Sequence, residues 1–411
     1  MNTTYNAKIA DVLVKRRAGQ FAFLQGLVRV NTTRGSAGFL KSSEKVAVML
    51  EKLGFEVERH APDKEICAAS GRSPMQNLVV RHRFTDGPVL ALVSHLDTVE
   101  AGPNWAHDPL AGDIRDGFLY GLGAVSGKGH LAAQVFAILA LRDAGVSLQG
   151  SIELHISFDG ESGGALGARW LLQEDRVKPD MVIAGGPAHA VATHSTGTMT
   201  MDVEVRGKTA PSHAPAHGHD ALEAASHALA RLYQFRGGLR GQVSAIPGLG
   251  SPSMVIERIA GSAEAGGVPD LVKFHIDRRL LPEEDPVQVE KQLTNLIGST
   301  IAKMPGVRCR IRRTSLIPAM GNNDASIIVR DTINSRLKSR SGAETVQTGM
   351  SFDHEGRHYA AAGIPTVMYG AGPLDPIAAG LHGPDEQLVL DDVRLGTETL
   401  ALSAIDLFTD S

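Results

Sequence analysis

The stretch PVLALVSHLDT, residues 88–98, decides the fold of this chain. Its first six residues form a continuous apolar run, which is typical of a strand buried on both faces of a parallel sheet. The run ends in Ser94-His95-Leu96-Asp97-Thr98. Polar residues at the carboxyl end of a buried strand mark the place where open α/β sheets hold their functional sites. The stretch therefore predicts a mostly parallel sheet with a site at the end of this strand.

The pattern on either side of this strand predicts two domains. Strands are predicted at 151–158 and 181–184. A helix is predicted at 130–144, between the strand that begins at Pro88 and the strand at 151–158. From Thr198 to Val205 the pattern changes to period two, which indicates a half-exposed antiparallel strand. A strand–helix–strand–strand–helix–strand order follows, and it suits a ferredoxin-like α+β domain. We predict an α/β domain made of residues 1–194 and 314–411, with a mixed, mostly parallel sheet flanked by helices, and an inserted domain at 195–313.

Composition excludes several classes of protein. The 411 residues include 43% hydrophobic and 21% charged residues, an ordinary globular mixture that can bury a sizeable core. The net charge of −4 gives no basic excess for nucleic acid or a membrane surface. We found no run of roughly 20 apolar residues that would span a membrane. Two cysteines cannot form a disulfide framework, so we expect a cytoplasmic protein. The 16 histidines direct attention to metal binding.

Three motifs, in order, resemble one family. Ser94–Gly129 reads SHLDTVEAGPNWAHDPLAGDIRDGFLYGLGAVSGKG, and Phe158–Arg169 reads FDGESGGALGAR. The third motif is Gly363-Ile364-Pro365-Thr366-Val367 followed by His382-Gly383-Pro384-Asp385-Glu386. The chain resembles the zinc-dependent aminoacylase, acetylornithine deacetylase and glutamate carboxypeptidase family, with its H-x-D-T-V and D-E-E-x-G-G-x-x-G-A-R patterns. The resemblance implies a two-metal hydrolase whose inserted domain serves as a lid and forms a homodimer.

Carried over position by position, the resemblance implies a metal site that keeps only part of its ligands. His95 matches the histidine of one metal, and Asp97 matches the carboxylate that orients it. The other metal keeps Glu161 and His382 as ligands. The aspartate that bridges both metals is replaced here, as are the general base and a later carboxylate. The three altered positions are Ser126, Gly160 and Gly186.

These replacements predict weak metal binding. A neutral serine hydroxyl supplies no charge to a divalent ion, so we expect the His95 metal to be absent or weak. Glu161 and His382 hold one ion only if a third group joins them. The candidates for that group are Asp159, His130 and Asp353-His354-Glu355. We expect one labile ion, zinc, manganese or cobalt, or none.

The inserted domain carries two further candidates. Where relatives place a histidine that stabilises the oxyanion in the partner's site, this chain has Pro211. His213, two residues on, is either a replacement oxyanion group or part of a polar surface loop. Arg279 matches an arginine of the family and either binds a substrate carboxylate or pairs with Asp277.

Two functions remain open from the sequence. The first is a metal-dependent hydrolase of a C–N bond, such as an amide or peptide, in a small carboxylate-bearing substrate, with one metal or a rearranged site. The second is a non-catalytic relative that keeps the fold and binds a small ligand or a partner. Either protein would bind neither nucleic acid nor membrane.

Overall fold

The computed structural model describes residues 2–36, 38–262, 266–321, 324–342, 347–352 and 354–409. The chain divides into two compact units. The first consists of residues 1–193, 322–348 and 353–411, and the second of residues 194–321 and 349–352. The return to the first unit lies later than residue 314, because strand β12 (Arg308–Ile317) continues along the sheet of the second unit.

The first unit is built on a mixed, mostly parallel sheet, as the sequence predicted. Its strand order is β1-β2-β6-β3-β7-β14-β8-β13. The four central strands β6, β3, β7 and β14 are mutually parallel, whereas the pairs β1·β2, β2·β6 and β14·β8 are antiparallel. The bounds are β1 (Val57–His60), β2 (Asn77–Arg83), β3 (Val89–His95), β6 (Ser151–Ser157), β7 (Met181–Ala184), β8 (Val191–Ser195), β13 (Gln347–Met350) and β14 (Thr366–Met368).

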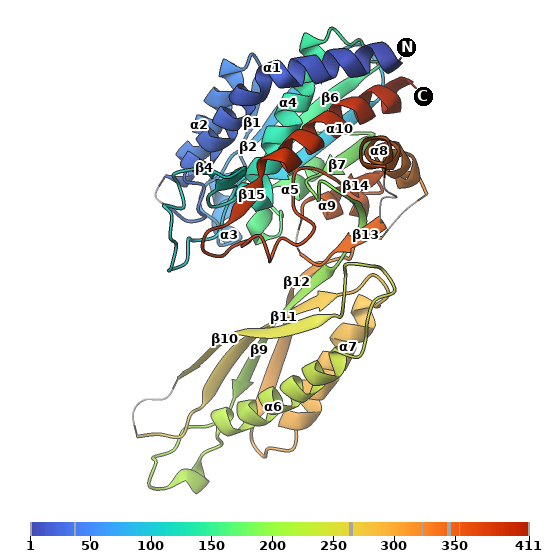
Figure 1. Ribbon diagram of the computed structural model, residues 1–411. Helices are drawn as coiled ribbons and strands as arrows, with labels where there is room; N and C mark the ends of the chain where they lie inside the picture. The colour runs from blue at the N-terminus through green and yellow to red at the C-terminus, as the bar shows by residue number, and fades with distance from the viewer. Residues whose placement is uncertain are drawn as a thin grey trace. The chain divides into compact units, whose positions relative to one another are not determined.

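Helices cover this sheet. Figure 1 shows α1 (Asn2–Arg29), α4 (Gly129–Asp143) and α10 (Leu390–Thr409) side by side, and each packs against the other two. The segment Ala124–Asp143 is long and apolar enough to cross a membrane, but 94% of its apolar 18-residue window is buried inside the structure. Its apolar composition is therefore that of a helix buried in the protein core. The other helices of this unit are α2 (Phe39–Lys52), α3 (Lys64–Ala69), α5 (Ala168–Gln173), α8 (Ser326–Ser341) and α9 (Gly356–Ala361).

A small antiparallel sheet brings the third motif to the first. Its order is β15 (Gln387–Val389), β5 (Phe118–Tyr120) and β4 (Asp113–Arg115). Gln387 pairs with Tyr120, so the residues that precede β15 lie beside the glycine-rich segment that follows β5.

The second unit has the predicted ferredoxin-like topology. Its elements are β9 (Gly197–Arg206), α6 (Ala221–Leu239), β10 (Ser253–Ser262), β11 (Leu271–Leu280), α7 (Pro286–Ile301) and β12. The strand order is β10-β11-β9-β12, with antiparallel pairs throughout. Asp220 and Asp285 cap the two helices: the Asp220 side chain accepts hydrogen bonds from two backbone N–H groups of the first turn of α6, and the Asp285 side chain accepts one from the first turn of α7. The alternating residues Met199, Met201, Val203 and Val205 are buried in its core, as the period-two pattern indicated.

Candidate functional site

Asp97 joins the ends of two neighbouring parallel strands. His95 ends β3, and its Nδ1 lies 3.3 Å from Asp97 Oδ1. The buried Asp97 carboxylate also accepts hydrogen bonds from the backbone N–H of Gly160 (2.8 Å) and of Glu161 (3.0 Å). Burial opposes a charge on His95, but Asp97, with Glu161 and Glu355, raises its pKa to about 10. Asp97 thus orients the imidazole and fixes the loop after β6.

Glu161 and His382 contact each other although 221 residues separate them. Glu161 lies in the one-turn helix Gly160–Ser162, and His382 adopts a positive φ of 59°. His382 Nε2 lies 2.9 Å from Glu161 Oε1. Burial lowers the pKa of His382, yet Glu161 outweighs this and the net shift is upward. The structure therefore brings together the two positions that the resemblance assigns to one metal.

Gly160 has no room for a side chain. A Cβ atom on Gly160 would lie 2.2 Å from His95 Cγ and 2.5 Å from His95 Cβ. These atoms are at the root of the imidazole, so they cannot move without moving the end of β3. The glutamate that the resemblance places here does not fit this backbone.

Gly186 is closed by backbone. A Cβ atom on Gly186 would lie 2.7 Å from the carbonyl carbon of Met368 and from the amide nitrogen of Tyr369. Ser126 differs, because it is half-buried in the π-helical turn Ala124–Lys128 and its hydroxyl makes no hydrogen bond to any residue that the structure describes. One carboxylate position is therefore sterically closed, and another holds a neutral hydroxyl.

His130 occupies space beside Gly186. Its Nδ1 accepts a hydrogen bond from the backbone N–H of Ala371 (3.1 Å). Cβ atoms on Gly185 and Gly370 would meet its ring at 2.5 and 2.6 Å. Burial, assisted by the charge of His95, lowers the pKa of His130 to about 3, so the ring is neutral. His130 is thus a packing group with its Nδ1 already in use.

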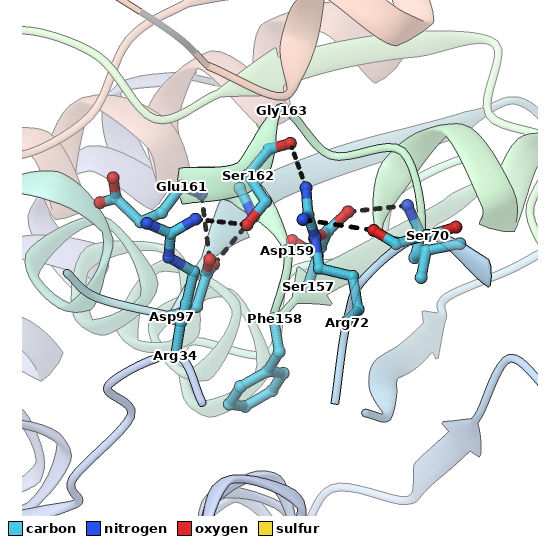
Figure 2. A network of polar contacts seen from close by, with 12 residues as sticks. Arg34, Ser70, Arg72, Asp97, Ser157, Phe158, Asp159, Glu161, Ser162 and Gly163 are labelled. Carbon is cyan, nitrogen blue, oxygen red and sulfur yellow. Dashed lines mark hydrogen bonds and ion pairs between the residues drawn. The ribbon is translucent and has the colours of Figure 1, made fainter. Parts of the chain in front are cut away.

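Asp159 points to a different set of partners. Its Oδ1 accepts from Arg72 Nε at 3.1 Å, and its Oδ2 accepts from the backbone N–H of Leu166 at 2.8 Å. Figure 2 shows Asp159 turned towards Arg72 rather than towards Asp97. Asp159 therefore stabilises the loop after β6 from its far side.

Glu355 is buried beneath the same loop. Its Oε1 accepts hydrogen bonds from Ser157 Oγ (2.5 Å) and from the backbone N–H of Ala168 (3.4 Å). Its Oε2 has no hydrogen-bond partner among the described residues. Burial raises the pKa of Glu355 to about 7, against the charge of His95. Of the cluster that precedes α9, Asp353 lies outside the described residues, and His354 is buried.

Two buried residues hold the glycine-rich segment in place. The Glu386 carboxylate accepts from the backbone N–H of Gly123 (3.0 Å) and of Val125 (2.7 Å). Lys128 Nζ donates to the carbonyl of Leu122 at 2.9 Å. Burial raises the pKa of Glu386 and lowers that of Lys128 to about 7. We assigned neither a role from sequence. The available signal was that each of the two, a lysine and a glutamate, lies inside one of the three motifs.

Comparison with known proteins identifies the family. The family model described as peptidase family M20/M25/M40 matches residues 91–406. The chain belongs to this family. M20 proteins are metallopeptidase- and deacetylase-type hydrolases that act on amide bonds, and the resemblance drawn from the three motifs is confirmed.

Curated M20 relatives match over part of their length. An acetylornithine deacetylase of Vibrio parahaemolyticus is 30% identical over 275 residues, which are 66% of this chain and 68% of that protein. A succinyl-diaminopimelate desuccinylase of Methylorubrum extorquens is 31% identical over 199 residues, 46% of this chain and 50% of that protein. The chain therefore aligns with about half the length of that desuccinylase.

Solved M20 structures share the fold over the whole chain. A tripeptidase of Staphylococcus aureus superposes with a TM-score of 0.72 at 20% identity, covering 96% of this chain and 99% of that one. Human carnosine dipeptidase 1 gives a TM-score of 0.73 at 16% identity, with 98% of each chain covered. YxeP of Bacillus subtilis, a dinuclear metal-binding M20 peptidase, gives 0.67 at 14% identity and covers 95% of this chain and 98% of that one.

The donor set of this chain does not fit a dinuclear M20 centre. Throughout the described part of the chain, no three His, Cys, Asp or Glu side chains come together in a group that could hold a metal ion. Structural zinc sites use four protein ligands and catalytic ones use three. Glu161 and His382 form a pair, and Asp159 and His130, two candidates for the third group, are engaged elsewhere.

The second unit holds the remaining two candidates. Arg279 lies on β11, where its Nε donates to Asp277 Oδ1 at 3.0 Å and its Nη1 donates to Thr198 Oγ1 at 3.2 Å. His213 is exposed in the loop between β9 and α6. Pro211 of the same loop forms a bridge with Gly267. The role of Arg279 in binding substrate and that of His213 at an oxyanion stay predictions.

Proposed function

We propose that this M20 protein binds a small amide- or carboxylate-bearing ligand on the family's scaffold without hydrolysing it at a two-metal centre. One observation carries the proposal. The position of the general base, Gly160, is in contact with His95, and a side chain there would overlap the imidazole. General-base assistance contributes typically 10²–10⁴-fold to a rate, and glycine supplies none of it.

The carboxylate positions support the same reading. Gly186 is closed by the backbone at Met368 and Tyr369, and Ser126 contributes no charge. An isolated divalent ion needs anionic or imidazole ligands to replace its water shell. His95 and Asp97 keep their mutual contact without a neighbouring carboxylate at either altered position.

A second candidate is a hydrolase of a C–N bond that works with one ion. The contact between Glu161 and His382 favours it, because both side chains stand at M20 ligand positions and face each other. Zinc, manganese or cobalt would suit imidazole and carboxylate ligands. For both candidates we propose a cytoplasmic homodimer that forms through the second unit, and N-acylated amino acids as the first compounds to examine.

Metal content and turnover, measured together, separate the two. The purified protein is incubated with zinc, manganese or cobalt, desalted, and analysed for bound metal and for hydrolysis of N-acyl amino acids and dipeptides. We expect less than one equivalent of metal and the same background rate in wild type, in Glu161→Gln and in the exposed control Glu65→Gln. Two equivalents, with turnover lost only in Glu161→Gln, would overturn the proposal. One equivalent with the same loss establishes the second candidate.

A further inference from the structure

A pocket of about 360 Å³ lies on the far side of the loop that carries Glu161. Its lining includes Arg34, Arg72, Glu100 and an apolar group formed by Phe39, Met75 and Phe158. The volume is near the lower end of the range for small-molecule sites, roughly 300–1,000 Å³. None of the lining residues stands at an M20 metal position.

Ser162 connects this pocket to the candidate site. It directly follows Glu161, and it holds two arginines at once: its Oγ accepts from Arg34 Nη1 at 2.5 Å and its carbonyl accepts from Arg72 Nη2 at 3.1 Å. Figure 2 shows the two guanidinium groups reaching Ser162 from opposite sides. The backbone N–H of Arg34 also donates to the carbonyl of Thr98 at 3.0 Å, just beyond Asp97. Both loops of the candidate site therefore shape the pocket.

The two arginines differ in what they leave free. Arg72 is committed, because its Nε pairs with the buried Asp159 and its remaining nitrogens donate to backbone carbonyls. Arg34 is exposed and, within the described ranges, forms no ion pair and no side-chain hydrogen bond other than the one to Ser162. A guanidinium presents its N–H donors as a planar fork that matches a carboxylate. Arg34 is thus a positive group that still offers this fork to a ligand.

The pocket also contains an unpaired negative group and an apolar floor. Glu100 is exposed and forms no ion pair, either with Arg34 or with any other residue in the described part of the chain. Phe39 and Phe158 are buried in an edge-to-face pair with ring centroids 6.2 Å apart, beside the buried Met75. Among the residues that the structure describes, the lining of this cavity thus offers one cation and one anion without an ion-pair partner, together with an apolar surface.

We propose that this pocket binds a zwitterionic α-amino acid with an apolar side chain. Arg34 takes the carboxylate, Glu100 takes the ammonium group, and the side chain packs on Phe39, Phe158 and Met75. This inference rests on the proposed function, because the amino acid would be the ligand that the protein binds without hydrolysing it. The binding itself does not depend on the metal positions.

Titration calorimetry on the full-length protein tests this assignment. The probes are L-phenylalanine, 3-phenylpropionate, which lacks the ammonium group, 2-phenylethylamine, which lacks the carboxylate, and inorganic phosphate. We expect L-phenylalanine to bind, each deleted probe to bind at least about 10-fold more weakly, and phosphate not to compete. Phosphate that binds and displaces L-phenylalanine would overturn the assignment in favour of a simple anion site.

Variants locate the binding. Arg34→Gln and Glu100→Gln are each expected to raise the Kd roughly 10- to 100-fold, because each removes a charge-assisted hydrogen bond. Ser162→Ala, which frees the Arg34 side chain, should raise it by a smaller factor. Arg240→Gln removes an exposed guanidinium far along the chain, at the residue that follows the end of α6, and should leave the Kd unchanged. Wild-type affinity in folded Arg34→Gln would refute the proposal.

The metal and turnover assays stay separate from this result. If wild-type protein binds L-phenylalanine through Arg34 and also hydrolyses amides with two metals, the pocket stands and the proposed function fails. If it binds neither metal nor L-phenylalanine, the absence of a two-metal hydrolase is supported and the pocket assignment fails.

Discussion

Adding a single methyl group at Gly160 should damage the site. In Gly160→Ala the new Cβ would lie 2.2–2.7 Å from three atoms of His95, where ordinary contacts begin near 3.4 Å. The imidazole must therefore retreat by about 1 Å, although interiors packed to crystal-like density have no gap to receive it. The retreat also breaks the 3.3 Å contact of His95 Nδ1 with Asp97.

Overpacking costs about 1–3 kcal/mol, and the lost hydrogen bond adds about 0.5–1.5 kcal/mol. We therefore expect Gly160→Ala to lower the free energy of unfolding by about 2–4 kcal/mol, which for a chain of 411 residues corresponds to a Tm lower by roughly 2–5 °C. Thermal denaturation followed by circular dichroism measures this, with Gly102→Ala as the control because nothing lies within 4 Å of a Cβ there. Equal Tm values for the two variants would refute the packing argument and with it the reading of Gly160 as a closed position.

Three further predictions follow from the buried groups around the site. Gly186→Ala should lower the free energy of unfolding by about 1–3 kcal/mol in urea denaturation, because its Cβ would meet backbone atoms at 2.7 Å. Glu386→Gln should lower it by about 1–3 kcal/mol, since the new amide N–H₂ faces one of the two backbone donors, Gly123 or Val125, while the amide oxygen accepts from the other; an unchanged urea midpoint would argue against that role. Burial holds the pKa of His130 at about 3, below the 6.5 of an exposed imidazole, so the unfolded chain binds more protons between these values and stability falls as the pH is lowered from 6.5 towards 3. At about pH 5 this loss is about 2 kcal/mol relative to about pH 7.5, and His130→Asn, whose amide oxygen can replace Nδ1 as acceptor, should remove it; the same pH dependence in both proteins would contradict the assignment.

The fold could be predicted from the sequence because buried strands leave a recognisable pattern of apolar residues. The apolar run that begins at Pro88 became the central strand β3, and the period-two stretch from Thr198 to Val205 became β9. The boundaries of the second unit were harder to predict from the sequence. Strand β12 continues to Ile317 through exposed and half-buried residues, so its sequence has no buried apolar pattern that would mark where the strand ends.

For the candidate site, the sequence predicted which residues of the family's metal centre are replaced, but not what fills their places. The substitution at Gly160 is visible in the second motif, and the one at Gly186 follows from the resemblance, but their contacts with His95 and with Tyr369 join segments that are far apart in sequence. The pocket could not be predicted from the sequence either, because it joins Phe158 of the second motif to Arg34, which lies in none of the three motifs. Residue types can be carried over position by position, whereas the space that they leave or fill depends on which distant segments meet there.

The filled spaces change what the missing carboxylates mean. If they had simply been removed from an otherwise unchanged M20 centre, Gly160 and Gly186 would face cavities into which a carboxylate could return. Instead His95 occupies the first space, the backbone at Tyr369 closes the second, and the His130 ring packs beside it. Restoring a side chain at Gly160 therefore requires the end of β3 to move, and restoring one at Gly186 requires the backbone at Met368 and Tyr369 to move. The spaces at Gly160 and Gly186 are therefore filled rather than vacant, which is the physical reason to look for the ligand of this protein in the open pocket at Arg34 rather than at the metal positions.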